Sequence, residues 1–495
     1  MPFSAPMTTP VTLAQVHGAF GDVGAQAGAF LDLALTPTGF AALFLGGVTI
    51  AVLLFSRTGT QLIAVFALFL LSMMRTDSKW ADNTLVQPLE TIRAFSRPLA
   101  FGLLIVIAAR SLGFPRGERL KFVALPTILF LSYELYYVTL IGAFVEPFRG
   151  IFGIIGYFAA FAAFALGLPK LMQRPGDSRG LLAILGLTGV LFIAANLFQL
   201  AGGYSNAVIQ GRLTGISGNP QQFTMTCCLF LIVGCYFFST GTAGSWFKWF
   251  AGLGLGVIGL FILWSGSRTG AICAVVILLA FFRMKIGRLA LLGIVGGGAF
   301  AIAVSVFGES LDIVERFFRG GDTRSEVWRA ALNDFASSPV VGQLPVTADD
   351  GLNFTESTYL RTLALMGVIG GSLLLAVMWS WIAMAIRVWR MARAVPSLEP
   401  EADFVLASTA YFAVASIGEG LMMGVLTIFV PFIYATFAIG SYVLDAGEQE
   451  LAAAAEQPWE LDGEEQFAST ELADEGGTDH GASSPATLGP GRLAT

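Results

Sequence analysis

Residues 251–264 of the chain read AGLGLGVIGLFILW, a run without a charged side chain, and residues 40–55, FAALFLGGVTIAVLLF, have the same character. Such runs approach the roughly 20 apolar residues that a helix needs to cross a bilayer. Of the 495 residues, 55% are hydrophobic and only 13% are charged, which is more apolar surface than a soluble core can bury. The strands of membrane β-barrels are shorter and alternate in polarity, so we expect an all-α polytopic membrane protein.

The apolar runs predict about 12–14 membrane-spanning helices. The expected spans lie near residues 38–55, 59–74, 97–114, 121–142, 150–170, 180–200, 219–239, 246–264, 268–283, 287–307, 358–386, 403–422 and 424–443. Residues 1–37 contain no Lys or Arg, so no charged segment of a cleavable signal is visible. We expect these residues to form a weakly ordered external segment ahead of a transmembrane domain at 38–443.

The basic residues predict which turns face the cytoplasm. They gather in alternate turns, as the positive-inside rule expects of cytoplasmic turns: Arg110, Arg116, Arg119 and Lys121; Lys170, Arg174 and Arg179; Arg283, Lys285 and Arg288; Arg387, Arg390 and Arg393. The turns between them are then external, and the longest is the loop 308–357. Residues 444–495 hold twelve acidic residues against Arg492 alone, which predicts a disordered cytoplasmic tail.

Cysteine and histidine usage excludes several kinds of site. All four cysteines lie inside apolar runs without metal-type spacing, and the two histidines, His17 and His480, lie in the tails. We therefore expect no resident metal, no other cofactor and no Ser-His or Cys-His nucleophile in the membrane domain. The net charge of −6 also gives no reason to expect a nucleic-acid partner.

Two arginines stand in turns that are predicted to be external. Arg212 lies in GRLTG, just before Asn219 and Pro220, which suit the cap and the first position of a helix. Arg268 follows Ser267 in the turn SGSRTG, where the next helix begins. Arginine side chains beside helix N-termini form a site for phosphate. The alternative is that both arginines reach lipid headgroups or pair with acidic residues.

The long loop is predicted to carry a helix of its own. The sequence Thr323-Arg324-Ser325-Glu326 is a capping box, and the helix should continue to about Ala336. Val327, Ala331 and Phe335 would form its apolar face, with Trp328 on the flank. Arg324 and Arg329 add positive charge to this helix. An amphipathic helix of this kind would either close over a substrate or only anchor the loop at the membrane surface.

These motifs together resemble the O-antigen ligase and O-antigen polymerase (Wzy-like) superfamily. The resemblance rests on Arg212 with Asn219-Pro220, on WSGSRTG at 264–270, on RSEVW at 324–328 before Pro339 and Gly342, and on ESTYL at 356–360 followed by GVIG at 367–370. It covers roughly residues 38–443. The serine-arginine-glycine turn and the long penultimate loop are fairly specific as a pair and weak individually.

The resemblance implies a metal-independent glycosyltransferase with a GT-C-like fold in the bacterial inner membrane. Such enzymes move a glycan from an undecaprenyl-diphosphate carrier to a glycan or lipid A-core acceptor at the periplasmic face. By position, Arg212 and Arg268 would hold the donor diphosphate, with Ser267, Trp328, Arg324 and Arg329 as further substrate-binding residues. Membrane lipids, a flippase and a chain-length regulator protein would be partners.

One position departs from the pattern of the ligases, which carry a histidine where this chain has Glu356. A carboxylate accepts a proton from an acceptor hydroxyl as a histidine does, so Glu356 is the candidate base. This difference favours a polymerase of exopolysaccharide or O-antigen over a ligase. A helix N-terminal acid favoured by the helix dipole is the alternative interpretation of Glu356.

Glu134 and Glu419 are acidic residues inside expected spans. Intramembrane carboxylates usually pair with a buried partner or take part in function. They support one rival hypothesis, a secondary transporter or flippase with coupling carboxylates. A purely structural role within an envelope assembly is the other.

The predicted topology can be tested by cysteine labelling. A cysteine introduced at Asp350 should react with a membrane-impermeant thiol reagent in intact cells, whereas one at Glu465 should react only after lysis, because the basic turns place the loop outside and the tail inside. Labelling at Glu465 but not at Asp350 in intact cells would contradict this orientation.

Overall fold

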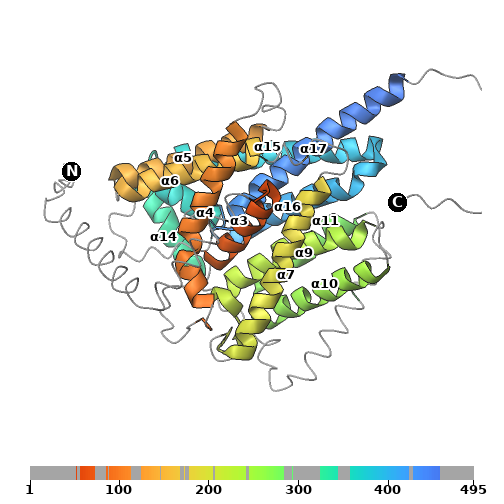
Figure 1. Cartoon of the computed structure of the whole chain (residues 1–495). Helices are drawn as coiled ribbons and strands as arrows, with labels where there is room; N and C mark the ends of the chain where they lie inside the picture. The colour runs from red at the N-terminus through yellow and green to blue at the C-terminus, as the bar shows by residue number, and fades with distance from the viewer. Residues whose placement is uncertain are drawn as a thin grey trace, which may run out of the picture. The chain divides into compact units, whose positions relative to one another are not determined.

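A computed structural model describes residues 52, 56–72, 85–86, 89–112, 124–144, 147–167, 172, 178–203, 207–240, 245–283, 293, 324–343, 357–422 and 427–456. Apart from a short hairpin, their regular elements are helical (Figure 1). The helices are α3 Thr58–Ser72, α4 Leu89–Leu112, α5 Leu125–Phe144, α6 Pro147–Phe161, the π-helical η1 Ala162–Gly167, α7 Ser178–Gly202, α9 Pro220–Ser239, α10 Ser245–Ser265, α11 Arg268–Phe282, α14 Arg324–Ser337, α15 Thr358–Ala394, α16 Glu399–Gly418 and α17 Phe429–Glu456. The short elements are β1 Val208–Ile209, β2 Arg212–Leu213 and the 3-10 turns η3 Gly215–Ser217 and η4 Pro396–Leu398.

Six of the described helices are long and apolar enough to cross a membrane: α5, α7, α9, α10, α15 and α17. Shorter apolar helices occupy Thr58–Ser72, Leu99–Arg110, Gly150–Ala165 and Arg268–Phe282. Every expected span overlaps a described helix except 38–55 and 287–307, of which only residues 52 and 293 are described. Helix α4 begins at Leu89, before its expected span, and α17 continues to Glu456, so residues 444–456 of the predicted disordered tail are helical. The chain is therefore an all-α membrane protein, as the apolar runs predicted.

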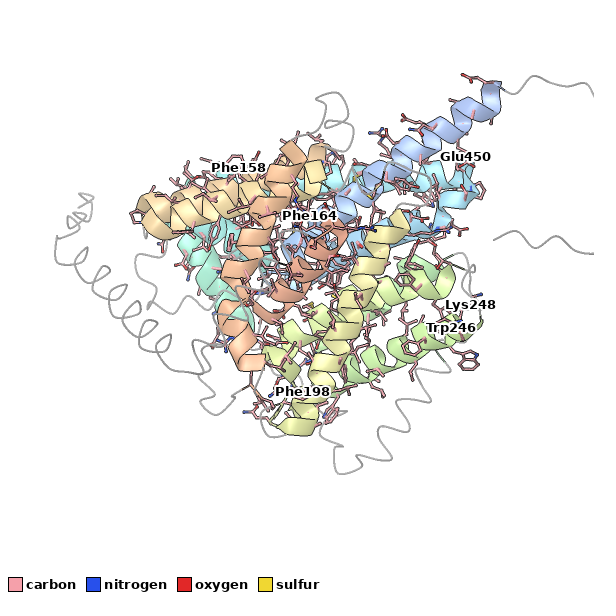
Figure 2. All side chains as sticks on the ribbon, viewed as in Figure 1. Phe158, Phe164, Phe198, Trp246, Lys248 and Glu450 are labelled. Atoms are coloured by element: carbon pink, nitrogen blue, oxygen red, sulfur yellow. The ribbon has the colours of Figure 1, made fainter. Side chains whose placement is uncertain are left out.

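The helices differ in how much of their apolar surface the protein itself covers. In the most apolar 18-residue stretch of α17, 83% is buried inside the protein, whereas in that of α10 only 28% is buried. Trp246 and Trp249 of α10 are exposed, and Figure 2 shows Trp246 at the outer end of that helix. Phe158 of α6 is exposed as well, whereas Phe164 of η1 is buried against Phe66 and Tyr434. Exposed aromatic and aliphatic side chains of this kind suit contact with lipid.

Contacts between helix ends define two ends of the bundle. At one, which we call the Arg283 end, Arg283 at the end of α11 forms an ion pair of 2.7 Å with Asp403 of α16. Ser178 of α7 and Tyr236 of α9 donate hydrogen bonds to Glu401 at the same end. At the other, the Arg212 end, the start of α15 meets the end of α16, where the Thr358 hydroxyl donates to the Glu419 carbonyl at 2.8 Å.

The chain after α14 packs its backbone into a kink in α15. Gly367 interrupts α15 with φ 59° and ψ −158°. In a regular helix the Val368 N–H would donate to the Ala364 carbonyl. Instead, the Val368 N–H donates to the Pro339 carbonyl at 2.8 Å, and the Ala364 carbonyl accepts from the Gln343 N–H at 2.7 Å. The Ile369 N–H also donates outside the helix, to the Val340 carbonyl. These groups released by the kink are therefore satisfied by residues 339–343, a segment that we call the clasp.

The clasp requires glycine on both sides. A Cβ at Gly367 would overlap the carbonyl of Val340, and a Cβ at Gly342, which has φ 81°, would overlap the backbone of Leu365. Other residues adopt such positive φ values only at a cost of roughly 1–2 kcal/mol. The pair of glycines thus allows two backbone segments to lie in direct contact.

Gly367→Ala should lower the thermal unfolding temperature of the purified protein in detergent. The new Cβ would overlap the carbonyl of Val340, and alanine would have to adopt an unfavourable positive φ. Gly254→Ala is the matched control, since a Cβ there meets nothing within 4 Å in the middle of α10. That variant should be neutral or more stable, by up to about 1 kcal/mol. Equal unfolding temperatures for the two variants would contradict the close backbone contact at the clasp.

Candidate functional site

Arg212 is carried by a small hairpin between α7 and α9. Strands β1 and β2 pair in antiparallel register through a tight turn in which Gln210 and Gly211 both have positive φ. Two consecutive positive φ values are typical of the type I′ turn, whose twist suits short hairpins. The base of the hairpin is closed, because the Thr214 N–H and hydroxyl both donate to the Ala207 carbonyl.

The predicted start of the next helix is confirmed. Asn219 caps α9 by accepting a hydrogen bond from the Gln221 N–H at 2.8 Å, and Pro220 occupies the first helical position. The side-chain amide of Asn196 on α7 fixes the segment that leads into α9, since its Oδ1 accepts a hydrogen bond from the Ile216 N–H at 2.8 Å. A Cβ at Gly215 would overlap this amide, so a glycine is needed where the chain passes it.

Arg268 stands at the first position of α11, where the sequence places it. The turn from α10 into α11 needs positive φ at Gly266, and Ser267 then caps α11 by accepting from the Gly270 N–H at 3.2 Å. Ser267 is buried, whereas Arg268 is exposed. The serine therefore shapes the turn, and the arginine projects from it.

The structure brings Arg212 against this turn, although 53 residues separate it from Ser265. The Arg212 Nε donates to the Ser265 carbonyl at 2.7 Å. A Cβ at Gly266 would lie 3.7 Å from the same Nε, so the guanidinium lies directly on the turn. This hydrogen bond fixes the plane of the guanidinium, and Arg212 and Ser267, predicted as parts of one site, do lie together.

Helices α9 and α11 approach each other closely behind the turn. A Cβ at Gly270 would overlap the methyl group of Thr224, so only glycine permits this approach. The Thr224 and Ser265 hydroxyls lie 2.5 Å apart, which links α9 to the end of α10. The capped N-termini of α9 and α11 thus lie next to the turn that Arg212 contacts and from which Arg268 begins α11. Partial positive charge at helix N-termini and a planar guanidinium both favour an oxyanion.

The N-terminus of α15 lies at the same end of the bundle. Ser357 caps α15, and both the N–H and the hydroxyl of Thr358 donate to the carbonyl of Glu419. The buried Glu419 side chain acts electrostatically on Cys273 of α11 and on Tyr411 of α16. Glu419 therefore links the start of α15 to α11, the helix that begins at Arg268. Glu356, the predicted base, lies outside the described residues.

The predicted loop helix is confirmed as α14, and it packs on α15. Ala331 and Ala364 form a small buried cluster with Val327 and Leu360 beside them. Trp328 and Arg329 are exposed, and nothing is described of the Arg324 side chain. No described contact joins Trp328 or Arg329 to Arg212 or Arg268, so their predicted role in substrate binding stays a prediction.

The structure adds residues that sequence analysis did not single out. Tyr133 of α5 is buried, and its hydroxyl lies 2.7 Å from that of Thr362 on α15. Arg361, the neighbour of Thr362, acts electrostatically on the same tyrosine. The sequence feature that could have indicated Arg361 is an arginine in the first turn of an apolar helix, five positions after Glu356. Glu134, which the sequence did single out, is fully buried beside Tyr157 and Tyr434.

The cysteines have the expected environment, because Cys227, Cys228, Cys235 and Cys273 are all free and buried. Among the described residues, no group of three or more His, Cys, Asp or Glu side chains is arranged to hold a metal ion. The groups gathered at the Arg212 end are arginines, hydroxyls and helix N-termini, which suit an anion.

Comparison with known proteins gives no independent assignment. No protein-family model matches the chain, and no curated protein is significantly similar to it. The resemblance to the O-antigen ligase and polymerase superfamily thus remains a prediction from short motifs.

Proposed function

We propose that the chain transfers a glycan from an undecaprenyl-diphosphate carrier to an acceptor hydroxyl at the periplasmic face of the bacterial inner membrane. The observation that carries the proposal is the placement of Arg212 on the Ser265–Ser267 turn, next to the exposed Arg268 and two capped helix N-termini. Such a grouping at the end of a membrane bundle suits the diphosphate of a lipid-linked donor, whose hydrocarbon tail remains among the helices.

The chemical role of the arginines follows from the reaction. As the bond between the sugar and the diphosphate breaks, negative charge grows on the departing oxygen. Guanidinium groups fixed beforehand stabilise this charge without having to reorganise. The hydrogen bond from the Arg212 Nε to the Ser265 carbonyl fixes the group in this way.

Glu356 is the proposed base for the acceptor hydroxyl. It directly precedes Ser357, which caps α15 at the Arg212 end. We propose polymerisation of exopolysaccharide or O-antigen repeat units, because the ligases of the superfamily carry a histidine here. Ligation of the glycan to lipid A-core is the alternative within the same chemistry.

Glu134 favours a second candidate function, that of a secondary transporter or flippase. Its carboxylate is fully buried within α5 beside the Tyr157 hydroxyl, and it has no ion-pair partner among the described residues. Buried carboxylates of this kind couple ion movement to transport in many carriers. Transport of a lipid-linked glycan without chain extension, abolished by Glu134→Gln, would favour this function over the transferase.

Arg268→Lys should lower polymer output on the order of 10²-fold, because it keeps the charge but loses the planar fork that binds two oxygens at once. The measurement is chain extension of a lipid-linked substrate by the purified protein in lipid nanodiscs. Arg387→Lys is the matched control, since Arg387 is an exposed arginine in the C-terminal half of α15. If Arg268→Lys retains normal output, contact with lipid headgroups explains the arginine better than a diphosphate does.

Glu356→Gln should bind the lipid-linked donor normally yet lose transfer, on the order of 10²- to 10⁴-fold, as expected when a general base is removed. Glu356→His should retain part of the activity, because histidine accepts a proton in the same way. Glu326→Gln, at an exposed acid on α14, is the control. Full activity of Glu356→Gln would leave this carboxylate only a role at the start of its helix.

A further inference from the structure

Arg361 lies in the first turn of α15, at the Arg212 end of the bundle. Its N–H donates to the carbonyl of Ser357 at 3.0 Å, so its backbone position is fixed by the helix. Leu360 and Ala364 mark the side of α15 that packs on α14, and Thr362 marks the side that meets Tyr133 of α5. With about 100° of rotation per residue, Arg361 falls between these two sides.

Among the described residues, no hydrogen-bond or ion-pair partner accounts for the position of the Arg361 side chain. Its Nε is buried and forms no hydrogen bond with any described residue. The residue as a whole is only partly buried, so part of the side chain remains accessible to a ligand. Leaving a buried donor of a charged group without a hydrogen bond is costly, and each such group in a folded protein requires an explanation.

The nearest polar groups do not supply the missing partner. The Thr362 hydroxyl donates to the Thr358 carbonyl, so the Tyr133 hydroxyl donates to Thr362. Tyr133 is neutral in this arrangement and cannot balance a guanidinium. Glu134 forms no ion pair with it among the described residues, and the Glu134 carboxylate lies beside the Tyr157 hydroxyl.

A paired arginine elsewhere in the chain shows the contrast. Arg283 reaches Asp403 at 2.7 Å and also donates to the carbonyl of Ala280. Arg361, in the first turn of a membrane-spanning helix, has neither kind of contact with its side chain among the described residues. A charged side chain in such a helix is usually paired or functional.

We propose that Arg361 binds a phosphate-class oxyanion in a second subsite, apart from the one at Arg212 and Arg268. The inference rests on the proposed function for its biological meaning, because chain extension brings two lipid-linked molecules together and the acceptor retains its own diphosphate. A phospholipid headgroup offers the same chemistry and is the other source of the oxyanion. Tyr133 and Thr362 hold the side of the subsite that faces α5.

The test counts anions bound to the full-length protein in maltoside micelles by native mass spectrometry. The probes are farnesyl diphosphate, as a short polyprenyl diphosphate, and dioleoylphosphatidylglycerol. Wild-type protein should bind two molecules of farnesyl diphosphate. Arg361→Gln should retain one and bind the second at least tenfold more weakly, whereas Arg361→Lys should bind it with intermediate affinity. Arg390→Gln, at an exposed arginine further along α15, should retain both.

The outcomes separate this inference from the proposed function. Loss of the first site in Arg268→Lys with the Arg361-dependent site intact supports two subsites. Binding of phosphatidylglycerol alone, lost in Arg361→Gln, supports the oxyanion site with a headgroup as its source and contradicts the proposed donor site. Unchanged binding of both probes by Arg361→Gln overturns the inference and leaves the Arg268 prediction untouched.

A second measurement uses wild-type protein and does not depend on whether a variant folds. Phenylglyoxal modifies accessible guanidinium groups, and the modified residues are identified by peptide mass spectrometry. Farnesyl diphosphate or phosphatidylglycerol should protect Arg361 at least several-fold, while modification of the exposed Arg390 continues. Equal modification of Arg361 with and without both probes overturns the inference.

Discussion

Hydrocarbon offers no hydrogen-bond partner, so every backbone group that a helix releases inside a membrane protein must find a partner in the protein itself. The kink at Gly367 shows how this works. The carbonyl of Ala364 and the N–H of Val368 do not bond to each other, and both form hydrogen bonds with the clasp at 339–343 instead. The start of α15 follows the same pattern, since Thr358 satisfies the free carbonyl of Glu419 at the end of α16. Breaks in the helices are therefore sites of tertiary contact.

This requirement also explains why the candidate site lies at helix ends. Ser265 ends α10, and its carbonyl would have no helical partner in the turn that follows. The guanidinium of Arg212 satisfies that carbonyl, so a single hydrogen bond serves both the backbone and the orientation of the arginine. Hydroxyl groups of Thr224 and Ser267 and the missing side chain of Gly270 complete the junction of α9, α10 and α11. The groups proposed to bind a diphosphate are consequently part of the framework that joins the helices.

Charges inside the bundle divide into those with partners and those without. Asp403 and Glu401 at the Arg283 end accept hydrogen bonds from Arg283, Ser178 and Tyr236. Among the described residues, Glu134 has no ion-pair partner and the Nε of Arg361 has no hydrogen-bond partner, although both residues act electrostatically on Tyr133. Paired charges at one end suit a structural role in joining helices. The unpaired groups in the other part of the bundle suit exchange with a ligand or a proton, and this asymmetry supports a functional Arg212 end.

The amino-acid sequence by itself determined the helices and their starts, because the length of an apolar run, a capping side chain and a proline at the first position all act within a few residues. Asn219, Ser267 and the helix at 324–337 were predicted on these grounds, and the structure has them. Only the tertiary structure decided the contact of Arg212 with Ser265, the backbone clasp at Gly367 and the electrostatic effect of Arg361 on Tyr133. In each of these the partners are far apart along the chain, and either partner alone fits many other surroundings. A glycine in a helical run predicts weak packing, and an arginine near a span boundary predicts contact with headgroups. Only the folded bundle reveals which carbonyl, hydroxyl or backbone segment each of them meets.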